Sequence, residues 1–140
     1  MRRSKAEIYL HFVWGTLHRL PLVSDEIERD IYRCIGDQAS NLQCVVLAIG
    51  GIPDHVHLFV RVPAKTSASE LAKQVKGVSS AFGRDRLGGE SLFGWQDGYG
   101  VFSVSRSHVK RVIAYIENQK RHHAEGTLWP EWGKTDEETI

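Results

Sequence analysis

Residues 54–62, with the sequence DHVHLFVRV, limit the possible folds because two kinds of side chain alternate along them. Successive side chains of a β-strand point to opposite faces of its sheet. One face of this strand would carry only aliphatic residues and should pack on helices; these are Val56, Leu58, Val60 and Val62. The other face would carry His55, His57, Phe59 and Arg61. The stretch therefore predicts a sheet with one buried face and one open face that presents two neighbouring histidines.

Periodicity along the rest of the chain predicts four strands and three helices. Strands are expected over 6–17, 45–50, 54–62 and 99–105. Ser24 can cap a helix to about Leu42, Ser67 and Glu70 form a capping box for a second helix, and a third is expected over 107–123. This order favours an α+β, ferredoxin-like (RRM-like) βαββαβ sandwich with an antiparallel four-stranded sheet and an additional C-terminal helix. The histidine face of such a sheet would have no helix of its own.

Each predicted helix has an apolar stripe at helical spacing that should face the core. The stripes are Ile27, Ile31 and Ile35 in the first helix, Leu71, Val75, Val78 and Phe82 in the second, and Val109, Val112, Ile113 and Ile116 in the third.

The charge distribution divides the chain into a mildly basic body and an acidic tail. The net charge is +1, and the residues after His123 include five acidic side chains and only one basic one. We expect one domain over 1–123 and an acidic tail over 124–140. A basic body permits a phosphate-bearing partner without requiring one. No apolar stretch approaches the roughly 20 residues that span a bilayer, so we expect a cytoplasmic protein away from membranes.

His55 and His57 are candidate metal ligands. Alternate residues on one strand face have Cβ atoms about 7 Å apart, so two imidazoles can converge on one ion. The alternative is a pair of exposed or half-buried histidines on a sheet surface. Two ligands hold a divalent metal poorly, so a third must come from another part of the chain. His11, in the first strand, could join the site or simply line the sheet.

The third predicted helix, SHVKRVIAYIENQKRHH, carries a tyrosine beside its apolar stripe. Tyr115 lies about 110° around the helix from the centre of that stripe, so we do not expect it to be plain core. Tyr115 and Gln119 are four residues apart and share a face. The Gln119 carbonyl could complete a metal site with the two histidines, and the metal would help Tyr115 to act as a nucleophile on phosphorus. A purely structural Tyr115, Tyr99 as the nucleophile and Glu117 as the oxygen ligand remain open.

Three stretches carry a family resemblance: IGGIPDHVHLFV, WQDGYGVFSVS and YIENQ, in that order. Together they resemble the single-tyrosine HUH transposases of small bacterial insertion sequences, which are the IS200-like and REP-associated types. HUH denotes His–hydrophobic–His, here His55–Val56–His57. The resemblance covers about residues 6–123.

The resemblance implies a DNA transposase that binds single-stranded DNA, often as hairpins at the ends of a mobile element. Tyr115 would attack the scissile phosphate, form a 5′-phosphotyrosine and release a 3′-hydroxyl, which allows strand transfer without ATP. His55, His57 and Gln119 would hold Mg²⁺ or Mn²⁺. Members of the family are commonly homodimers in which the tyrosine helix of one subunit serves the histidine pair of the other. Such a protein would associate with the bacterial nucleoid when bound to DNA.

Basic side chains on two predicted helices could follow DNA phosphates with salt-sensitive affinity. They are Lys73, Lys76 and Arg84 on the second helix and Arg111 and Lys120 on the third. Each could equally be an ordinary solvated side chain. Besides the transposase, the sequence leaves open a non-catalytic single-stranded nucleic-acid-binding module, a domesticated transposase copy and a metal phosphodiesterase that uses water.

Overall fold

The four strands form one antiparallel sheet in a computed structural model that describes residues 4–121. The strands are β1 (Ile8–Gly15), β2 (Val45–Ile52), β3 (His55–Val62) and β4 (Gly100–Val104). Their order across the sheet is β2-β3-β1-β4, and each neighbouring pair is antiparallel. This topology confirms the predicted ferredoxin-like sheet, with β3 and β1 in the centre.

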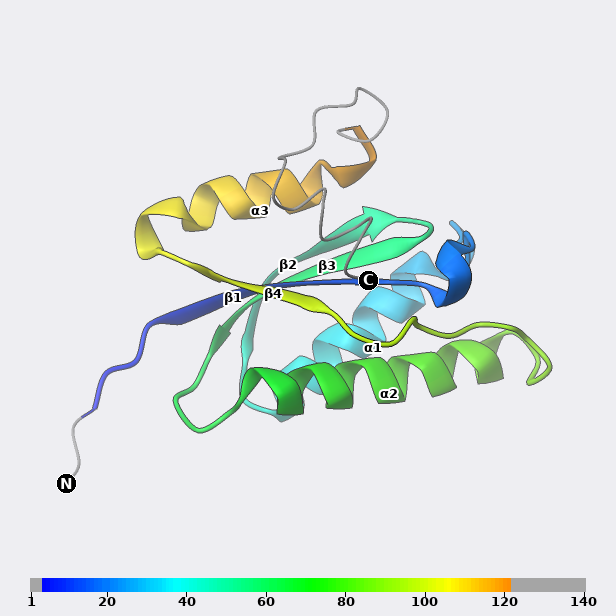
Figure 1. Cartoon of the computed structure of the whole chain (residues 1–140), viewed down its shortest axis with the longest axis horizontal. Coiled ribbons are helices and arrows are strands. Elements are labelled where there is room, and N and C mark those ends of the chain that lie inside the picture. Colours follow the sequence, from blue (N-terminus) through cyan, green and yellow to red (C-terminus); the bar gives the residue numbers. More distant parts are fainter. Residues whose placement is uncertain (1–3, 122–140) are drawn as a thin grey trace.

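Helices cover both faces of the sheet (Figure 1). Helices α1 (Glu28–Asn41) and α2 (Ala68–Arg86) lie on one face, and α3 (Val109–Glu117) lies on the other. Short 3-10 helices, η1 (Leu17–Arg19) and η2 (Arg106–His108), follow β1 and precede α3. No helix in the described part of the chain is long and apolar enough to cross a membrane.

The two faces of β3 enter two separate apolar clusters. Its aliphatic face belongs to the main core under α1 and α2. Phe59, on the opposite face, packs in a smaller cluster with Ala48 of β2 and with Val112, Tyr115 and Ile116 of α3. The expectation that the histidine face has no helix of its own is therefore wrong. The apolar stripe of α3 needs a surface to bury, and Phe59 and Ala48 provide it.

The first two helices form as predicted, except for the cap of α1 and one position in the apolar stripe of α2. Helix α1 begins at Glu28, and no side chain caps it; the Ser24 carbonyl instead accepts hydrogen bonds from the backbone N–H groups of Ile27 and Glu28. In α2, Ser67 Oγ accepts from the Glu70 N–H at 3.1 Å, which confirms the predicted cap. Val78 is 37% exposed, however, and Ser79 occupies the buried position beside it. The core-facing row of α2 runs at four-residue spacing through Leu71, Val75, Ser79 and Gly83.

The third helix is interrupted near its end. Asn118 leaves helical geometry, and its Nδ2 donates to the Ala114 carbonyl at 2.7 Å. Residues 119–121 are helical again. The predicted end at His123 and the predicted tail over 124–140 lie outside the described residues.

A hydrogen bond between Ser79 and Trp95 ties the 87–98 loop to α2. The Trp95 indole Nε1–H donates to Ser79 Oγ at 2.8 Å, and Ser79 Oγ donates to the Val75 carbonyl at 2.6 Å. The serine hydroxyl thus uses its single proton on the helix and accepts the indole proton. Because both side chains are buried, neither can exchange this bond for water.

We expect Ser79→Ala to destabilise the protein by about 1–3 kcal/mol, because the buried Trp95 N–H loses its acceptor. Urea unfolding followed by tryptophan fluorescence measures this change. Ser80→Ala is the matched control, since it removes only a hydrogen bond to the Gly77 carbonyl near solvent. It should change the free energy of unfolding by less than about 0.5 kcal/mol. Equal losses in the two variants would contradict the assigned role of Ser79.

Candidate active site

His55 and His57 lie on β3 in the middle of the sheet, between β1 and β2. Both side chains are fully buried, and their ring centroids are 5.2 Å apart. The predicted shared face is therefore correct, but the face is not open. The two imidazoles are held on a central strand beneath α3.

Helix α3 brings Tyr115 to the histidines, and Gln119 follows just after it. The Tyr115 and His57 ring centroids are 5.9 Å apart in an edge-to-face arrangement, and Gln119 Oε1 lies 3.3 Å from His55 Nε2. The predicted four-residue spacing thus brings both side chains to the histidine pair. Tyr115 is only 2% exposed and packs in the Phe59 cluster. The expectation that it lies outside the core is wrong, because the flank of α3 contacts the sheet as well as its apolar stripe.

Gly50 of β2 allows this close contact with α3, and Gly51 allows the close approach of β2 to the start of β3. A Cβ atom at Gly50 would lie 2.3 Å from the Ile116 carbonyl oxygen, and one at Gly51 would lie 2.2 Å from the His55 carbonyl oxygen. Gly50 is also the direct β-sheet partner of His57. The backbone of α3 therefore rests on the sheet beside the histidine pair, at a place where no side chain would fit.

Each histidine has a side-chain partner at its Nδ1 atom. His55 Nδ1 lies 2.8 Å from Asp54 Oδ1, and His57 Nδ1 lies 2.8 Å from His11 Nε2. Arg19 Nη2 lies 3.3 Å from the same Asp54 oxygen.

Sequence reasoning missed Asp54 and Arg19 as members of the site and left the role of His11 open. Two signals could have found Asp54 and His11. Asp54 directly precedes the first histidine, and His11 pairs with Phe59 across two central strands, which places it diagonally from His57 on the same face.

Asp54 is held as a carboxylate. Its partial burial raises the pKa of the carboxyl, but the hydrogen bond with His55 and the attraction of His55 and Arg19 together lower that pKa below its usual value. A carboxylate can only accept hydrogen bonds, so the proton of the 2.8 Å contact belongs to His55 Nδ1. In the neutral imidazole, which is the form that binds a metal, His55 Nε2 then presents a lone pair toward Gln119.

The donor set fits a divalent cation with nitrogen and oxygen ligands. His55 Nε2 and Gln119 Oε1 are two acceptors that face each other at 3.3 Å. Such a pair is accommodated either by a rotated amide or by a cation between the two atoms. Within residues 4–121 no three His, Cys, Asp or Glu side chains are placed to hold a metal ion, so the third ligand available to the histidine pair is the amide oxygen. Mg²⁺ and Mn²⁺ both accept oxygen and imidazole ligands.

Residues 4–119 match the family model described as "Transposase IS200 like". The chain belongs to the IS200-like transposases. The ISDra2 transposase TnpA of Deinococcus radiodurans is 24% identical over an alignment of 129 residues, which covers 85% of this chain and 91% of that protein.

Two solved structures are similar to this IS200-like transposase. A transposase from Deinococcus radiodurans R1 has a TM-score of 0.66 and 24% identity, and the match covers 85% of this chain and 98% of that one. A REP-associated tyrosine transposase bound to a REP hairpin has a TM-score of 0.63 and 15% identity, and the match covers 93% and 79%. At these identities the two structures support the shared fold.

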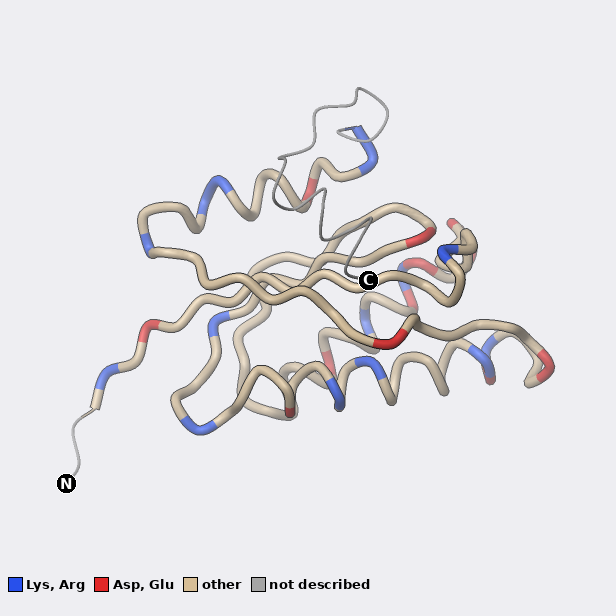
Figure 2. The backbone as a smooth tube through the Cα atoms, in the orientation of Figure 1, with Lys and Arg blue, Asp and Glu red and all other residues tan. Residues whose placement is uncertain are grey.

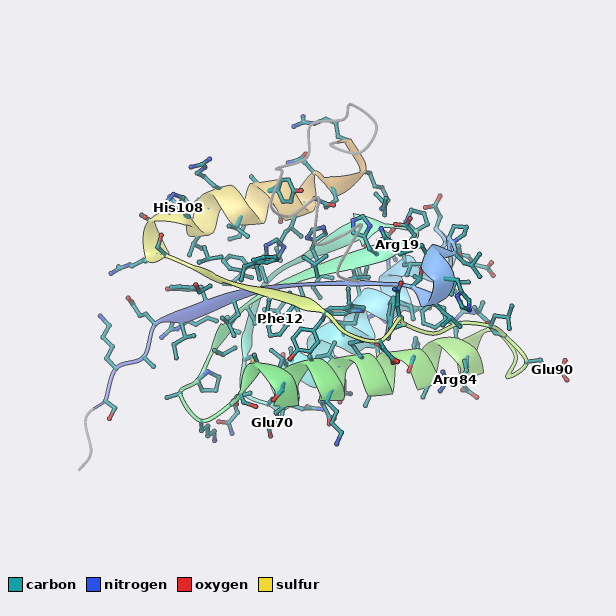
Figure 3. All side chains as sticks on the ribbon, viewed as in Figure 1. Phe12, Arg19, Glu70, Arg84, Glu90 and His108 are labelled. Atoms are coloured by element: carbon teal, nitrogen blue, oxygen red, sulfur yellow. The ribbon has the colours of Figure 1, made fainter. Side chains whose placement is uncertain are left out.

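The basic side chains predicted to bind DNA are divided between opposite sides of the transposase sheet. Lys73, Lys76 and Arg84 lie on α2, on the side away from the histidines, whereas Arg111 and Lys120 lie on α3 and just beyond it (Figure 2). Arg84 points outward at the far end of α2, and its Nη1 lies 3.4 Å from the Phe93 carbonyl oxygen (Figure 3). The structure therefore does not bring the α2 residues to the histidine pair.

Lys76 and Lys120 make contacts within the protein. Lys76 Nζ donates to the Gln96 carbonyl at 2.8 Å and to the Gly98 carbonyl at 2.6 Å, and burial lowers the pKa of its ammonium group. Lys120 Nζ pairs with the Glu28 carboxylate of α1 at 2.6 Å. Each contact gives its lysine a structural role beside any contact with DNA.

The alternative site residues lie elsewhere. Tyr99 packs on Phe12 and the main core, on the α1 and α2 side of the sheet. Glu117 is exposed on α3. Neither side chain joins the cluster of His55, His57, Tyr115 and Gln119.

We expect Gly50→Ala to push α3 off β2 and to destabilise the protein by about 1–3 kcal/mol, as overpacking does. Urea unfolding gives the free energy, and hydrogen exchange of the α3 amides locates the change. Gly36→Ala is the matched control, because its Cβ would meet only Ile49 Cδ1 at an ordinary 3.6 Å within helix α1. Gly36→Ala should leave α3 exchange unchanged. Wild-type exchange in Gly50→Ala would show that α3 does not need this close approach.

Proposed function

We propose that this IS200-like transposase cuts and rejoins single-stranded DNA, with Tyr115 as the nucleophile. The supporting observation is the meeting of α3 and β3. The Tyr115 ring lies 5.9 Å from the His57 ring, and Gln119 Oε1 lies 3.3 Å from His55 Nε2. The REP-associated neighbour is bound to a REP hairpin, which supports a DNA hairpin as the substrate.

The proposed reaction exchanges one ester for another at phosphorus. The Tyr115 oxygen loses its proton and forms a bond to the scissile phosphorus, while the bond from phosphorus to the 3′ oxygen breaks. The 3′ oxygen gains a proton and leaves as a hydroxyl, and the 5′ phosphate remains on the tyrosine. Attack by a 3′-hydroxyl on the phosphotyrosine reverses these steps and joins two strands. Because each step replaces one phosphoester bond with another, no ATP is required.

His55, His57 and Gln119 are the residues that would hold the divalent metal, Mg²⁺ or Mn²⁺. When bound, such a metal acts as a Lewis acid toward phosphate oxygens. A tyrosine hydroxyl has an ordinary pKa of about 10, so it needs help to react near neutral pH. Strand β3 keeps the histidines in fixed positions, and α3 carries the tyrosine to them.

The burial of Tyr115 adds a requirement to this proposal. The side chain is 2% exposed in the described state. A phosphodiester can reach its hydroxyl only when α3 separates from the sheet. We therefore propose that DNA binding and release of α3 are linked.

In the described state α3 lies on the sheet of its own chain (Figure 1). The homodimer with active sites shared between subunits, which the family resemblance implies, remains a prediction. So do the cytoplasmic location and the association with the nucleoid.

The binding-module alternative is less well supported by the surface of the sheet. Modules of that kind stack unpaired bases on exposed aromatic side chains of the central strands. Phe59 is fully buried under α3, and Tyr9 is half-buried. The histidine, tyrosine and glutamine cluster would also have no use in such a module.

We expect Tyr115→Phe to abolish the covalent protein–DNA product while leaving DNA binding intact, since only the attacking oxygen is removed. A denaturing gel with labelled single-stranded DNA from the ends of the element, with Mg²⁺ or with EDTA, measures the product. His57→Ala should also lose it, and EDTA should remove it from the wild type.

Tyr99→Phe is the matched control and should form the adduct at the wild-type level. A covalent band in Tyr115→Phe would refute the nucleophile. Cleavage without any covalent band in Tyr115→Phe would indicate the water-using phosphodiesterase. Binding without cleavage by the wild type would indicate a binding module or a domesticated copy.

A mixture of Tyr115→Phe and His57→Ala proteins tests whether a site is built within one chain. If each site uses one chain, the mixture stays inactive, because every chain lacks one component. If the tyrosine helix serves the partner subunit, mixed dimers regain one complete site and the covalent band returns. The same gel, run after the subunits have been co-refolded, distinguishes the two arrangements: recovery would support the shared site that the family resemblance implies, and absence of recovery would support a site within one chain.

A further inference from the structure

The geometry points to Asp54 and His11 as positioning residues, which fix the tautomers and ring orientations of His55 and His57. Both contact Nδ1, so the proton that each neutral imidazole carries would lie there and the Nε2 lone pair could serve as a metal ligand. For the metal this inference rests on the proposed function. The direction of the Asp54–His55 hydrogen bond does not depend on that function, whereas the direction of the His11–His57 bond is assigned through it.

Asp54 holds His55 through a short contact. The 2.8 Å bond between Asp54 Oδ1 and His55 Nδ1 requires the proton on nitrogen, because a carboxylate has none to give. The backbone of Asp54 is fixed as well, since its carbonyl accepts from the Thr16 N–H at 2.9 Å. The carboxylate therefore has a fixed place from which to orient the ring.

Arg19 reaches the same Asp54 oxygen from a strained turn, and its Nη2 also lies 3.3 Å from His55 Nδ1. His18 and Arg19 have φ angles of 54° and 55°, in the left-handed region that non-glycine residues seldom adopt. The turn is closed by Thr16 Oγ1, which donates to the Leu20 carbonyl at 2.6 Å. Figure 3 places Arg19 beside the turn between β2 and β3, where its Nη2 lies 3.3 Å from Asp54 Oδ1. Strained backbone of this kind is common at functional sites, where the surroundings hold it in place.

His11 holds His57 in the same manner from the neighbouring strand. The two rings are fully buried and stacked with centroids 5.0 Å apart, and one proton lies between His11 Nε2 and His57 Nδ1. If His11 donated that proton, neutral His57 would carry its own on Nε2 and could not bind a metal there. Metal binding therefore assigns the proton to His57 Nδ1 and makes His11 the acceptor.

Two aromatic rings pack beside His11. The rings of Phe59 and Phe102 lie 6.4 and 6.1 Å from it, centroid to centroid. They contribute packing, and neither can form a hydrogen bond with His11 Nε2. Hydrogen-bonding partners of metal-binding histidines typically contribute about 10–100-fold to metal affinity.

Two measurements on the full chain test the assignment. Long-range ¹H–¹⁵N NMR of the imidazole nitrogens, without metal and with Mg²⁺, reports which nitrogen carries each proton. Electron paramagnetic resonance of free Mn²⁺ gives the dissociation constant of the metal. In the wild type we expect both His55 and His57 to carry a proton on Nδ1.

The variants separate positioning from packing. His11→Leu and Asp54→Ala remove the acceptors and should weaken Mn²⁺ binding by about 10-fold or more. His11→Gln and Asp54→Asn keep an acceptor oxygen with little loss of shape, and they should recover a large part of the affinity. Phe102→Leu is the matched control, because it changes the packing beside His11 and leaves its nitrogen in place. Thermal melts without metal verify that each variant is folded.

Two outcomes would overturn the positioning roles of Asp54 and His11, and a third would overturn the proposed metal site alone. A proton on Nε2 of either histidine in the metal-loaded wild type would overturn the positioning roles. An equal loss of affinity in Phe102→Leu and His11→Leu would also overturn them, because packing alone would explain both. If the tautomers are as assigned and the wild type binds no Mn²⁺, the hydrogen-bond roles stand and the proposed metal site fails.

Discussion

The burial of β3 on both faces is the constraint on which the rest of the structure depends. Its aliphatic face closes the main core, and its other face places His55, His57 and Phe59 beneath α3. Buried imidazoles are costly unless their nitrogens have partners. Asp54 supplies one partner from the preceding turn, His11 another from β1, and Gln119 a third from beyond α3. Docking of α3 on the sheet therefore also brings a partner to a buried histidine, and the candidate active site forms where α3 meets β3.

The two apolar clusters explain how α3 could leave the sheet without loss of the fold. The main core joins the sheet to α1 and α2, whereas the α3 cluster is small and its buried members on the sheet are Ala48 and Phe59. Regions with few buried apolar contacts open at lower free energy than the global unfolding of a protein. A nine-residue helix held mainly by Val112, Tyr115 and Ile116 is such a region. The tyrosine thus lies on an element held by the smaller cluster, and the histidines lie on a central strand whose other face belongs to the main core.

Local pattern predicted the strands, the Ser67 cap and the parity of β3, because these depend on neighbours within a few residues. The sequence did not predict that the histidine face is covered, since covering it depends on how closely α3 can approach. That approach is set by Gly50, which looks like an ordinary turn glycine in the chain but lies against the Ile116 carbonyl. The core position of α2 shows the same limit. Hydropathy favours Val78 over Ser79 as the buried residue, but Ser79 is buried because its hydroxyl accepts a hydrogen bond from the Trp95 indole, which is distant in the sequence.

The candidate ligand set has a further electrostatic consequence. His55, His57 and Gln119 are all neutral as ligands, so a divalent cation held by them would keep its full charge toward a phosphate. A glutamate at the position of Gln119 would cancel part of that charge. The only carboxylate that the described residues place in contact with either histidine is Asp54, and it acts through the far side of the His55 ring. For the proposed reaction on an anionic diester this arrangement would be favourable, because the Asp54 carboxylate would orient the ligand without competing with the phosphate for the cation.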